Sequence, residues 1–398
     1  LPVADAWGFV GHEIVATIAQ IHLDPSALPA ICSLLGVVPS DTSEATLRHQ
    51  CHIAPIATWA DRNRMHMRWS AAFHYVGAVD DHPGGNCQYP GPNGWEGTKG
   101  VNVLDGIKNT THILAEWSGV SEDDVQSLFN PTIPRNRSPS TSKLSAKVPG
   151  PLEEEAFKFL VHFLGDMHQP LHLTGRDRGG NSAKVVFENK ETNLHSVWDG
   201  ALLTRLIRTV GPEYNRPLPD NGELPIPSWQ IEQALRNTIY DALIRRVMWE
   251  GVEHKWIDEI PEWFTCPEVA LAPKNAPRAS FKETLLSAFQ DPLSLPTKLV
   301  DLVTAPRPGV EIRPDGPIVC PYAWSTPLHE LNCQYIWPAV LNVTEAASPR
   351  RPHPPSRFPK LDTPEYLAAL DKDLVMEKLL AQGGLRLAAV LNWLFAQV

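Results

Sequence analysis

Long hydrophobic runs and charged side chains are both scarce in this sequence. No uninterrupted apolar window reaches the length of about 18 residues that a membrane-spanning helix needs. We therefore expect no such helix within these 398 residues and no stable membrane association. Only 20% of the residues are charged, and 35 basic against 45 acidic side chains give a formal charge of −10. That balance argues against a protein that binds nucleic acid by broad neutralisation of phosphates, although bound metal ions can supply the missing positive charge.

The six cysteines include no CxxC pair, which favours three disulfides over a thiolate metal site. Two further patterns also predict secretion. Ala4-Asp5-Ala6 has the small-x-small form of a signal-peptidase site, so residues 1–6 are either the remnant of a signal peptide or simply a disordered terminus. Three Asn-x-Ser/Thr sequons occur, at Asn109, Asn136 and Asn342. Together these features predict a secreted glycoprotein whose mature chain begins at Trp7.

Helical periodicity dominates the sequence, and 43% hydrophobic residues suffice for a large core. Only residues 183–188 read as a strand, so we predict an all-α fold with a minor β hairpin. Four breaks rich in Pro, Ser or Gly lie near 130–151, 211–228, 265–278 and 304–321, and we interpret them as long surface insertions into one domain spanning 7–398. Helices are predicted over 7–21, 43–60, 100–117, 152–169, 196–209, 228–257, 280–291, 325–343 and 363–397.

A histidine-rich segment around residues 159–172 carries the first chemical signal. His162 and Asp166 are four residues apart, so a helix places them on one face, and Pro170 ends that helix before His172. Two histidines and a carboxylate are suitable ligands for zinc. With 15 histidines and 45 acidic residues in the chain, however, a single His-xxx-acid pair is expected by chance and is better explained as a solvated ion pair.

Further candidate ligands occur in a defined order along the chain. His195 and Asp199 form a second pair four residues apart, and Asp61 lies in the segment Trp59-Ala60-Asp61. Taken separately, His12 or His74 is more simply a hydrogen-bonded structural histidine. Taken together, the residues form an ordered series.

That series resembles the secreted zinc-dependent single-strand nucleases of fungi, the S-one/P-one type, which are grouped with the bacterial zinc phospholipases C. The match runs from Trp7 to Asp199 and resumes at Gly383–Ala388. The resemblance implies the mainly helical fold of that superfamily and nine metal-ligand positions, all of them filled: Trp7, His12, Asp61, His74, His162, Asp166, His172, His195 and Asp199.

Three zinc ions are implied by this resemblance. Asp61, His74, His162 and Asp166 would hold the first; His172, His195 and Asp199 the second; and Trp7 and His12, with Asp166 as a bridge, the third. In such a centre, a zinc-bridging hydroxide attacks the phosphorus, and an open zinc ion accepts the leaving 3′ oxygen. The amine that Trp7 would contribute is free only after cleavage before that residue.

The resemblance also assigns residues around the metals. Asp166 and Arg64 match catalytic positions, with Arg64 as a phosphate clamp, and Asp80 is a candidate for orienting the attacking water. Tyr75 and Arg178 would contact the base, and Arg64 would contact the phosphate. Gly77 occupies the position at which the family has a base-binding aspartate. A family disulfide falls on Cys87 and Cys333; by elimination we pair Cys32 with Cys51 and Cys266 with Cys320. Asn109 matches a family glycosylation site.

The expected activity is hydrolysis of phosphodiester bonds in single-stranded DNA and RNA to 5′-phosphorylated products, together with 3′-nucleotidase activity. The expected partners are those substrates, without an obligate protein partner. One alternative is a phospholipase C-type phosphodiesterase with the same three metals, which predicts exposed apolar residues around the cleft. A second alternative is a homologue that binds zinc or nucleotides without turnover.

Overall fold

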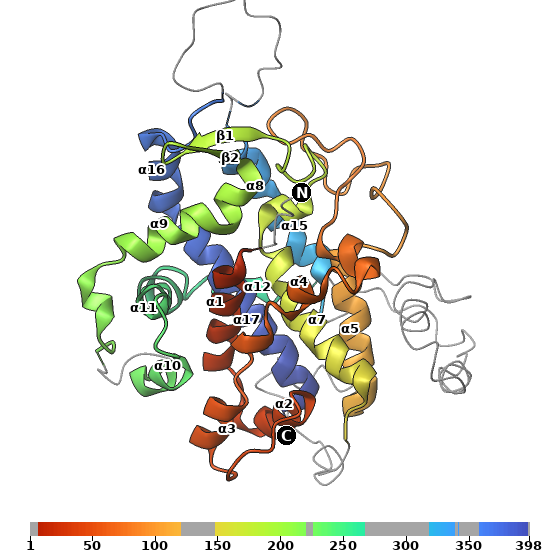
Figure 1. The fold of residues 1–398 in the computed structure, drawn as a ribbon, viewed down its shortest axis with the longest axis vertical. Helices are drawn as coiled ribbons and strands as arrows, with labels where there is room; N and C mark the ends of the chain where they lie inside the picture. The colour runs from red at the N-terminus through yellow and green to blue at the C-terminus, as the bar shows by residue number, and fades with distance from the viewer. Residues whose placement is uncertain are drawn as a thin grey trace, which may run out of the picture.

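The computed structural model describes residues 7–120, 148–219, 226–266, 318–338, 341 and 358–396. In these ranges the chain is mainly helical, and its only sheet within them is the pair β1 (Lys184–Phe187) and β2 (Lys190–Asn193) (Figure 1). The strands run antiparallel, with Lys184 opposite Asn193 and Phe187 opposite Lys190. The expected all-α fold with a minor hairpin is thus confirmed.

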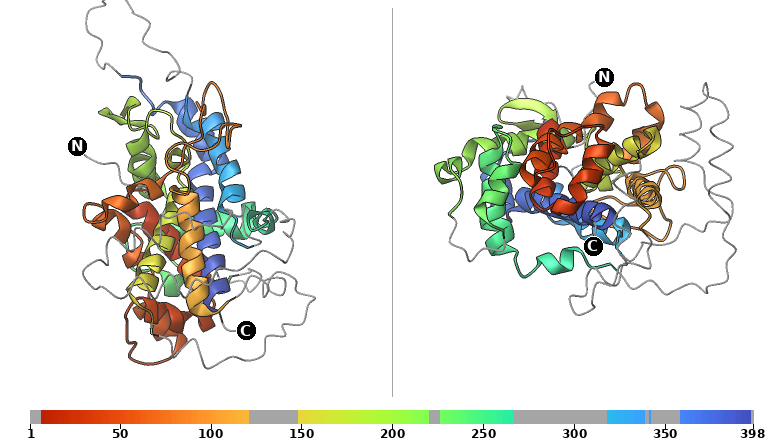
Figure 2. Two further views of the ribbon diagram at one scale, coloured as in Figure 1. Left: turned by 90° about the vertical axis from the view of Figure 1, so that its right-hand side faces the viewer. Right: turned by 90° about the horizontal axis from the view of Figure 1, so that it is seen from below.

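Four helices form the core: α1 (Phe9–Ile21), α5 (Val103–Ser118), α7 (Pro151–Met167) and α17 (Val375–Phe395). α1 and α5 each pack against both α7 and α17, so the first and last described helices are neighbours (Figures 1 and 2). Every residue of α1 from Gly11 to Ile21 is buried, as is almost all of α17. Helices buried on all sides are held by their neighbours, which makes this core a firm support for side chains that point inward.

Shorter elements surround the core. On the left in Figure 1 lie α9, α10 and α11, and on the right lies α15. The remaining described elements are η1 (Pro25–Ala27), α2 (Leu28–Leu34), α3 (Glu44–Gln50), η2 (Ala54–Ile56), α4 (Trp59–Asn63), η3 (Arg68–His74), η5 (Pro170–Leu173), α8 (Leu194–Ser196), η6 (Val197–Ala201), α9 (Leu202–Thr209), η7 (Pro212–Asn215), α10 (Ser228–Ala234), α11 (Asp241–Arg246), η8 (Val247–Lys255), α12 (Ile260–Trp263), α15 (Pro321–Leu331), η10 (Asn332–Ile336) and α16 (Pro364–Asp373).

Local sequence sets the limits of α7, the central helix. Pro151 occupies its first turn, where no backbone N–H is needed, and the Gly150 N–H donates to the Glu153 carboxylate at 2.8 Å. Glu153 and Glu154 place negative charge at the positive end of the helix dipole. The helix ends at Met167, and Pro170 begins the short helix η5. The expected helix over 152–169 is therefore present with shifted ends.

Three expected helices are each broken in the structure. The stretch 43–60 contains α3, η2 and the start of α4, since Pro55 lies in its middle. The stretch 228–257 is interrupted after Ala234, where Leu235 is extended and Asn237 has a φ of 58°. The stretch 363–397 splits into α16 and α17 at Leu374, whose φ is 51°. Such left-handed residues interrupt a helix without any glycine or proline to signal the break.

The proline-rich insertions lie largely outside the described residues, which resume at 148, 226 and 318. The predicted helix over 280–291 and the end of the one over 325–343 also lie outside them. Four described parts of these insertions are helical: η7, and three residues that each begin a helix, Pro151 of α7, Ser228 of α10 and Pro321 of α15. Lys360, at the end of the basic proline-rich stretch 348–360, forms a parallel bridge with Val186 of β1.

Three disulfides pair the six cysteines as expected: Cys32–Cys51, Cys87–Cys333 and Cys266–Cys320. Of the sequons, Asn109 lies half-buried on α5, whereas Asn136 and Asn342 fall outside the described residues. Within the described residues, no helix taken singly has the length and apolar character to cross a membrane. One sharply bent pair, α1 with residues 25–34, meets those criteria jointly by length and composition alone.

Candidate metal centre and active site

The helix α7 and the turn after it supply three of the candidate ligands. His162 and Asp166 lie one turn apart on the same face of α7, and both are fully buried. His162 Nε2 is 3.3 Å from Asp166 Oδ2. Because Pro170 ends the helical path, His172 on η5 returns toward Asp166, with 3.8 Å between its Nδ1 and Asp166 Oδ1. The arrangement is the one expected from the spacing of these residues.

The first cluster, defined as Asp61, His74, His162 and Asp166, comes from three elements. Asp61 lies on α4 and His74 ends η3, and their Oδ1 and Nδ1 atoms are 3.8 Å apart. His74 Nδ1 is also 3.0 Å from Asp166 Oδ2, and His162 Nε2 is 3.6 Å from Asp61 Oδ1. Four side chains from three segments thus direct polar atoms at a single point.

The second cluster consists of His172, His195 and Asp199, whose potential ligand atoms all lie within 4.8 Å of one another. His195 and Asp199 are four residues apart across α8 and η6, with Nε2 and Oδ2 separated by 3.1 Å. Gly179 supports His195: its φ is 62°, and its carbonyl oxygen accepts a hydrogen bond from His195 Nδ1 at 2.6 Å. A Cβ at Gly179 would lie 2.6 Å from the Leu171 carbonyl oxygen, so only glycine fits there.

The third cluster, Trp7, His12 and Asp166, joins the start of α1 to α7. His12 Nε2 is 3.3 Å from Asp166 Oδ1, and the His12 ring stacks on that of His162 with centroids 4.0 Å apart. This approach requires a glycine at position 165, because a Cβ there would lie 2.4 Å from His12 Nδ1. Trp7 is fully buried, and the next residue, Gly8, donates its N–H to the Asp199 carbonyl oxygen at 2.8 Å.

The donor atoms of all three clusters suit zinc. Nδ1 of His162, His172 and His195 each contacts a backbone carbonyl oxygen at 2.6–2.7 Å. Since a carbonyl oxygen only accepts, Nδ1 carries the hydrogen and Nε2 presents its lone pair to the cluster. Several buried atoms here have no hydrogen-bond partner among the described residues: both ring nitrogens of His12, Asp61 Oδ1, His74 Nε2, Asp166 Oδ1, His172 Nε2 and Asp199 Oδ2. Buried polar atoms without partners are costly unless a ligand satisfies them.

The electrostatics of the protein alone also favour cation binding. Burial would raise the pKa of the Asp166 carboxyl, but His162 and the other neighbouring histidines hold it well below its usual range. Burial likewise opposes ionisation of Asp61, yet His162 lowers the pKa of that carboxyl to about 2. Burial lowers the pKa of His172 to about 4, so its imidazole is neutral at ordinary pH. Ionised carboxylates and a neutral imidazole are the forms that bind zinc. Burial opposes protonation of His162, but Asp166 and Asp61 raise the pKa of this imidazole well above its usual value, so zinc would displace a proton there.

The candidate substrate residues lie at the edges of these clusters. Arg64 ends α4, half-buried, and its N–H donates to the Asp61 carbonyl oxygen at 3.2 Å. Tyr75 directly follows His74 and is 54% exposed. Arg178 is exposed with a φ of 58° in the turn before Gly179. Asp80 is exposed and accepts a hydrogen bond from Asn93 Nδ2 at 2.6 Å, which is its only side-chain contact found among the described residues.

The sequence patterns missed two polar residues that support the site. Gln169 is buried between ligands, and its amide donates to Asp199 Oδ1 at 2.5 Å while accepting from the Leu171 N–H at 2.7 Å. Asp81, rather than the neighbouring Asp80, is the buried acid of its loop, and it accepts hydrogen bonds from Thr174 and His329 at 2.9 and 2.8 Å. Neither a glutamine after a histidine motif nor one of two adjacent aspartates belongs to a periodic sequence pattern. Only the folded structure therefore distinguishes these two residues from other polar residues.

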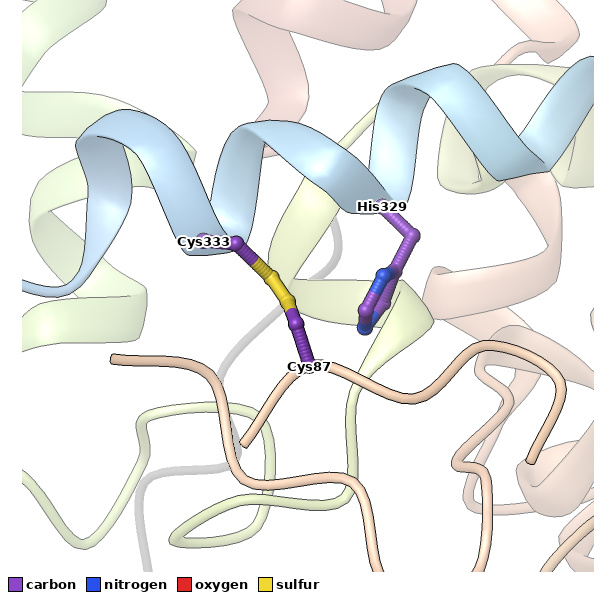
Figure 3. Close-up of side chains that lie close together, drawn as sticks. All are labelled: Cys87, His329 and Cys333. Carbon is purple, nitrogen blue, oxygen red and sulfur yellow. A yellow bond between two sulfur atoms is a disulfide. The ribbon is translucent and has the colours of Figure 1, made fainter. Parts of the chain in front are cut away.

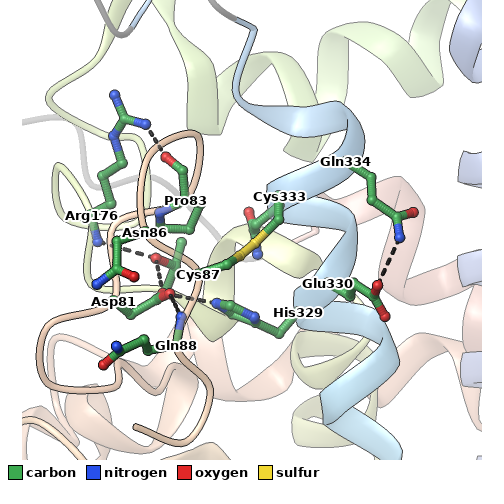
Figure 4. The surroundings of a disulfide bond; sticks show 12 residues. Asp81, Pro83, Asn86, Cys87, Gln88, Arg176, His329, Glu330, Cys333 and Gln334 are labelled. Carbon is green, nitrogen blue, oxygen red and sulfur yellow. Dashed lines mark hydrogen bonds and ion pairs between the residues drawn. A yellow bond between two sulfur atoms is a disulfide. The ribbon is translucent and has the colours of Figure 1, made fainter.

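His329 and a disulfide anchor the loop that carries Tyr75 and Asp80. In Figure 3 the His329 ring lies beside the Cys87–Cys333 bond, and Figure 4 shows Asp81 between this histidine and the Gln88 backbone. The two sulfurs and the imidazole are close enough to hold a metal ion, but the disulfide takes both sulfurs out of ligation. We therefore interpret this group as an anchor.

Comparison with known proteins identifies the family. The family model described as S1/P1 Nuclease matches residues 7–264. Among similar proteins, Endonuclease 2 of Arabidopsis thaliana is 29% identical over 278 residues, covering 68% of this chain and 73% of its own length. Nuclease P1 of Penicillium citrinum is 32% identical over 203 residues, covering 50% and 60%. Endonuclease 3 of Arabidopsis thaliana is 25% identical over 398 residues, covering 98% and 89%.

These matches agree with the residues at the site. The matched region begins at Trp7 and includes all nine candidate ligands up to Asp199. It also covers well over half of the chain. The chain therefore belongs to the S1/P1 nuclease family and is an enzyme that hydrolyses phosphodiester bonds of nucleic acid.

Proposed function

We propose that this protein is a secreted, zinc-dependent endonuclease that cleaves single-stranded DNA and RNA to 5′-phosphorylated products and removes the phosphate of 3′-nucleotides. One observation carries the proposal. Three groups of buried His and Asp side chains, drawn from α1, α4, η3, α7, η5 and α8–η6, meet around Asp166 with unpaired donor atoms directed inward. Buried polar atoms without partners destabilise a fold, and bound cations would satisfy these atoms.

The nine candidate ligands would hold three zinc ions, divided among the first, second and third clusters. Zinc supplies Lewis-acid chemistry: it lowers the pKa of water and stabilises negative charge on phosphate oxygens. Asp166 would belong to two clusters, since Oδ1 faces His12 and Oδ2 faces His74. The carbonyl contacts of His162, His172 and His195 fix each ring in the orientation that binding needs.

Other residues would position the substrate. Arg64, one turn after Asp61, would bind a phosphate with its guanidinium. Tyr75 offers an exposed ring on which a base can stack, and Arg178 a guanidinium that can do the same. Asp80 is our candidate for orienting the attacking water once the substrate is bound. Bases stack on these groups only when unpaired, which favours single strands.

Export fits the same proposal. Three disulfides form in oxidising surroundings, and Asn109 lies in a sequon on a described helix. The disulfides and the zinc ligands would thus both be suited to a protein that works outside the cell.

Purified protein tests the proposal directly. Its zinc should be counted by mass spectrometry, and its activity measured on single-stranded DNA, RNA, duplex DNA, and 3′- and 5′-mononucleotides. We expect cleavage of single strands with 5′-phosphate ends and release of phosphate from the 3′-mononucleotide alone. His172→Ala should lose zinc and activity, whereas His112→Ala, at an exposed position on α5, serves as the matched control. A fully zinc-loaded protein that hydrolyses none of these substrates would contradict the proposal.

A second candidate, a phospholipase C-type phosphodiesterase, has one observation in its favour. Phe9 and Met65 are 56% and 67% exposed, and each lies within four residues of a candidate ligand, as does Tyr75. Exposed apolar side chains near a metal centre are suited to lipid as well as to unpaired bases. Phosphatidylcholine therefore belongs in the same substrate panel, and faster hydrolysis of this lipid than of single-stranded DNA would favour the second candidate.

A further inference from the structure

The segment after Asp61 carries basic side chains with no acidic side chain among them. Residues 62–79 contain no acidic side chain and include Arg62, Arg64 and Arg68, in a chain whose formal charge is −10. We call residues 62–69 the basic segment. A run of positive side chains in an acidic protein is a local feature that the net charge of the whole chain does not show.

Both ends of the basic segment are fixed at the candidate metal centre. It begins after Asp61 and leads through η3 to His74, and these two ligands approach within 3.8 Å. Between them the backbone is tightly turned: the N–H groups of His66 and Met67 both donate to the Asn63 carbonyl oxygen, at 2.8 and 2.9 Å. Asp61 and His74, which lie before and after the basic segment, therefore hold it beside the candidate metal centre.

Aromatic packing fixes the inner side of the segment. Trp59, just before it, and Trp69, at its end, both contact Phe159 of α7, with ring centroids 5.4 and 5.5 Å apart. Phe159 is itself buried. One face of the segment thus lies on the helix that carries His162 and Asp166, and its other face is turned to solvent.

The solvent face presents cations and one large apolar side chain. Arg62, His66 and Arg68 are exposed, and Met65 is 67% exposed between them. Arg62 donates to the Pro55 carbonyl oxygen at 2.8 Å, and within the described residues neither Arg62 nor Arg68 forms an ion pair. Several arginines elsewhere are paired with acids: Arg48 with Glu44, Arg205 with Asp371, Arg208 with Glu188, Arg245 with Glu232, and Arg246 with Glu250 and Glu377. Exposed Arg178 and Arg216, like Arg62 and Arg68, form no ion pair in the part of the chain that the structure describes.

We propose that the basic segment is a docking surface for single-stranded nucleic acid, binding backbone phosphates beyond the one that is cleaved. This inference rests on the proposed function and extends it from the reacting phosphate to its neighbours. Arg62 and Arg68 supply the charge, and Met65 supplies an apolar contact for an unpaired base. Attraction to phosphates is the main contribution to such binding and weakens with salt.

The test compares a long substrate with a short one. In Arg62→Gln/Arg68→Gln, we expect KM for a twelve-nucleotide oligothymidylate to rise roughly tenfold at low salt. Hydrolysis of a thymidine dinucleotide should stay within twofold of the wild type, because it has no phosphate beyond the scissile one. The slope of log KM against log salt should decrease by about 0.7 for each phosphate that the variant no longer binds.

Two variants control for charge and for folding. Arg208→Gln/Arg216→Gln removes the same charge from exposed positions on and after α9, which lies on the opposite side of α1 from α4 in Figure 1, and it should leave both substrates unaffected. Arg62→Lys/Arg68→Lys keeps the charge and should restore most of the affinity for the long substrate. A role in folding alone would give no such rescue and would affect both substrates equally.

Each outcome bears on the inference. Equal KM values for the Gln variant and the α9 control, or an equally large effect on the dinucleotide, would overturn it. Binding of a fluorescein-labelled phosphorothioate oligothymidylate, followed by anisotropy, gives a measurement that needs no turnover. If the wild type binds this probe and the Gln variant does not, the docking surface stands even where hydrolysis fails, so the two proposals are tested separately.

Discussion

At the scale of single residues, the candidate centre depends most on Asp166. Its two oxygens face His12 on one side and His74 and His162 on the other, so one carboxylate connects two clusters. The spacing from His162 to Asp166 could be predicted from sequence because both lie on one helix. The contacts that orient the histidines could not, since they are made to carbonyl oxygens of Ala57 and Gly179, and a carbonyl is the same for every residue type.

Gln169 gives the first prediction at this scale. Gln169→Met keeps the length of the side chain but removes its hydrogen bond to Asp199 and leaves the Leu171 N–H unpaired. We expect zinc affinity at the second cluster to fall roughly 10–100-fold, as for other residues that orient ligands. Competition with a chelator measures this, and Gln334→Met, at an exposed position, is the matched control. Equal zinc affinity in the two variants would show that Gln169 does not position Asp199.

A second residue-scale prediction concerns the amine of Trp7. A chain that begins at Leu1 has an amide at Trp7, whereas one that begins at Trp7 has a free amine, which we propose as a zinc ligand. We expect the longer chain to bind its third zinc ion more weakly. Intact-mass analysis combined with metal counting tests this on both chains, and three equally tight ions in the uncleaved chain would refute it.

At the scale of elements, apolar periodicity located the helices but not their interruptions. α1, α5 and α7 occur close to the predicted ranges because their buried stripes are continuous. The break between α16 and α17 occurs at Leu374, a residue that favours helices. Its left-handed backbone is one that leucine rarely adopts, so a local sequence pattern does not predict the break.

Arg386 on α17 gives a prediction for this packing. The side chain is buried, donates to the Trp263 carbonyl oxygen at 2.9 Å, and contacts His168 Nε2 at 3.0 Å, just after α7. Burial lowers the pKa of its guanidinium to about 9. Arg386→Met leaves both acceptors unpaired, so we expect the free energy of unfolding to fall by about 2–4 kcal/mol.

Urea denaturation measures this change, and Arg386→Lys should lie between the wild type and Arg386→Met because lysine can reach one acceptor but not both. Since His168 directly precedes Gln169, zinc affinity should fall as well. Unchanged stability in Arg386→Met would mean that the buried charge costs as much as its hydrogen bonds contribute.

At the scale of the whole molecule, the nine candidate ligands lie between Trp7 and Asp199, but the helix that packs behind them ends at Phe395. The ordered ligand series identified the family from sequence alone, and the family match agrees with it. The sequence could not show that Arg62 and Arg68 are exposed while Trp69 packs against Phe159 of α7, because this depends on contacts between segments far apart in the chain.

Glu253 gives a prediction for the stability of the whole protein. Both carboxylate oxygens are buried without a hydrogen-bond partner among the described residues, and burial raises the pKa of this group from 4.5 to about 7. As pH rises through this range, the unfolded chain loses the proton first, so the free energy of unfolding falls. Glu253→Gln should therefore be more stable than the wild type above pH 7, by about 1–3 kcal/mol.

The difference should nearly disappear below about pH 4, where the carboxyl is neutral in the folded state and mostly neutral in the unfolded one. Urea denaturation at the two pH values measures it, with Glu262→Gln, at an exposed position on α12, as the control. A stabilisation that does not depend on pH would show that Glu253 is protonated throughout or paired on folding.

The contact between α1 and α17 has a consequence for how the protein is made. A ribosome releases α1 well before α17, and at about 5–20 residues per second the interval is on the order of a minute. During that time the side of α1 that packs on α17 is uncovered, which leaves the newly made chain open to aggregation until α17 emerges. Shortened chains that lack α17 should remain in that state.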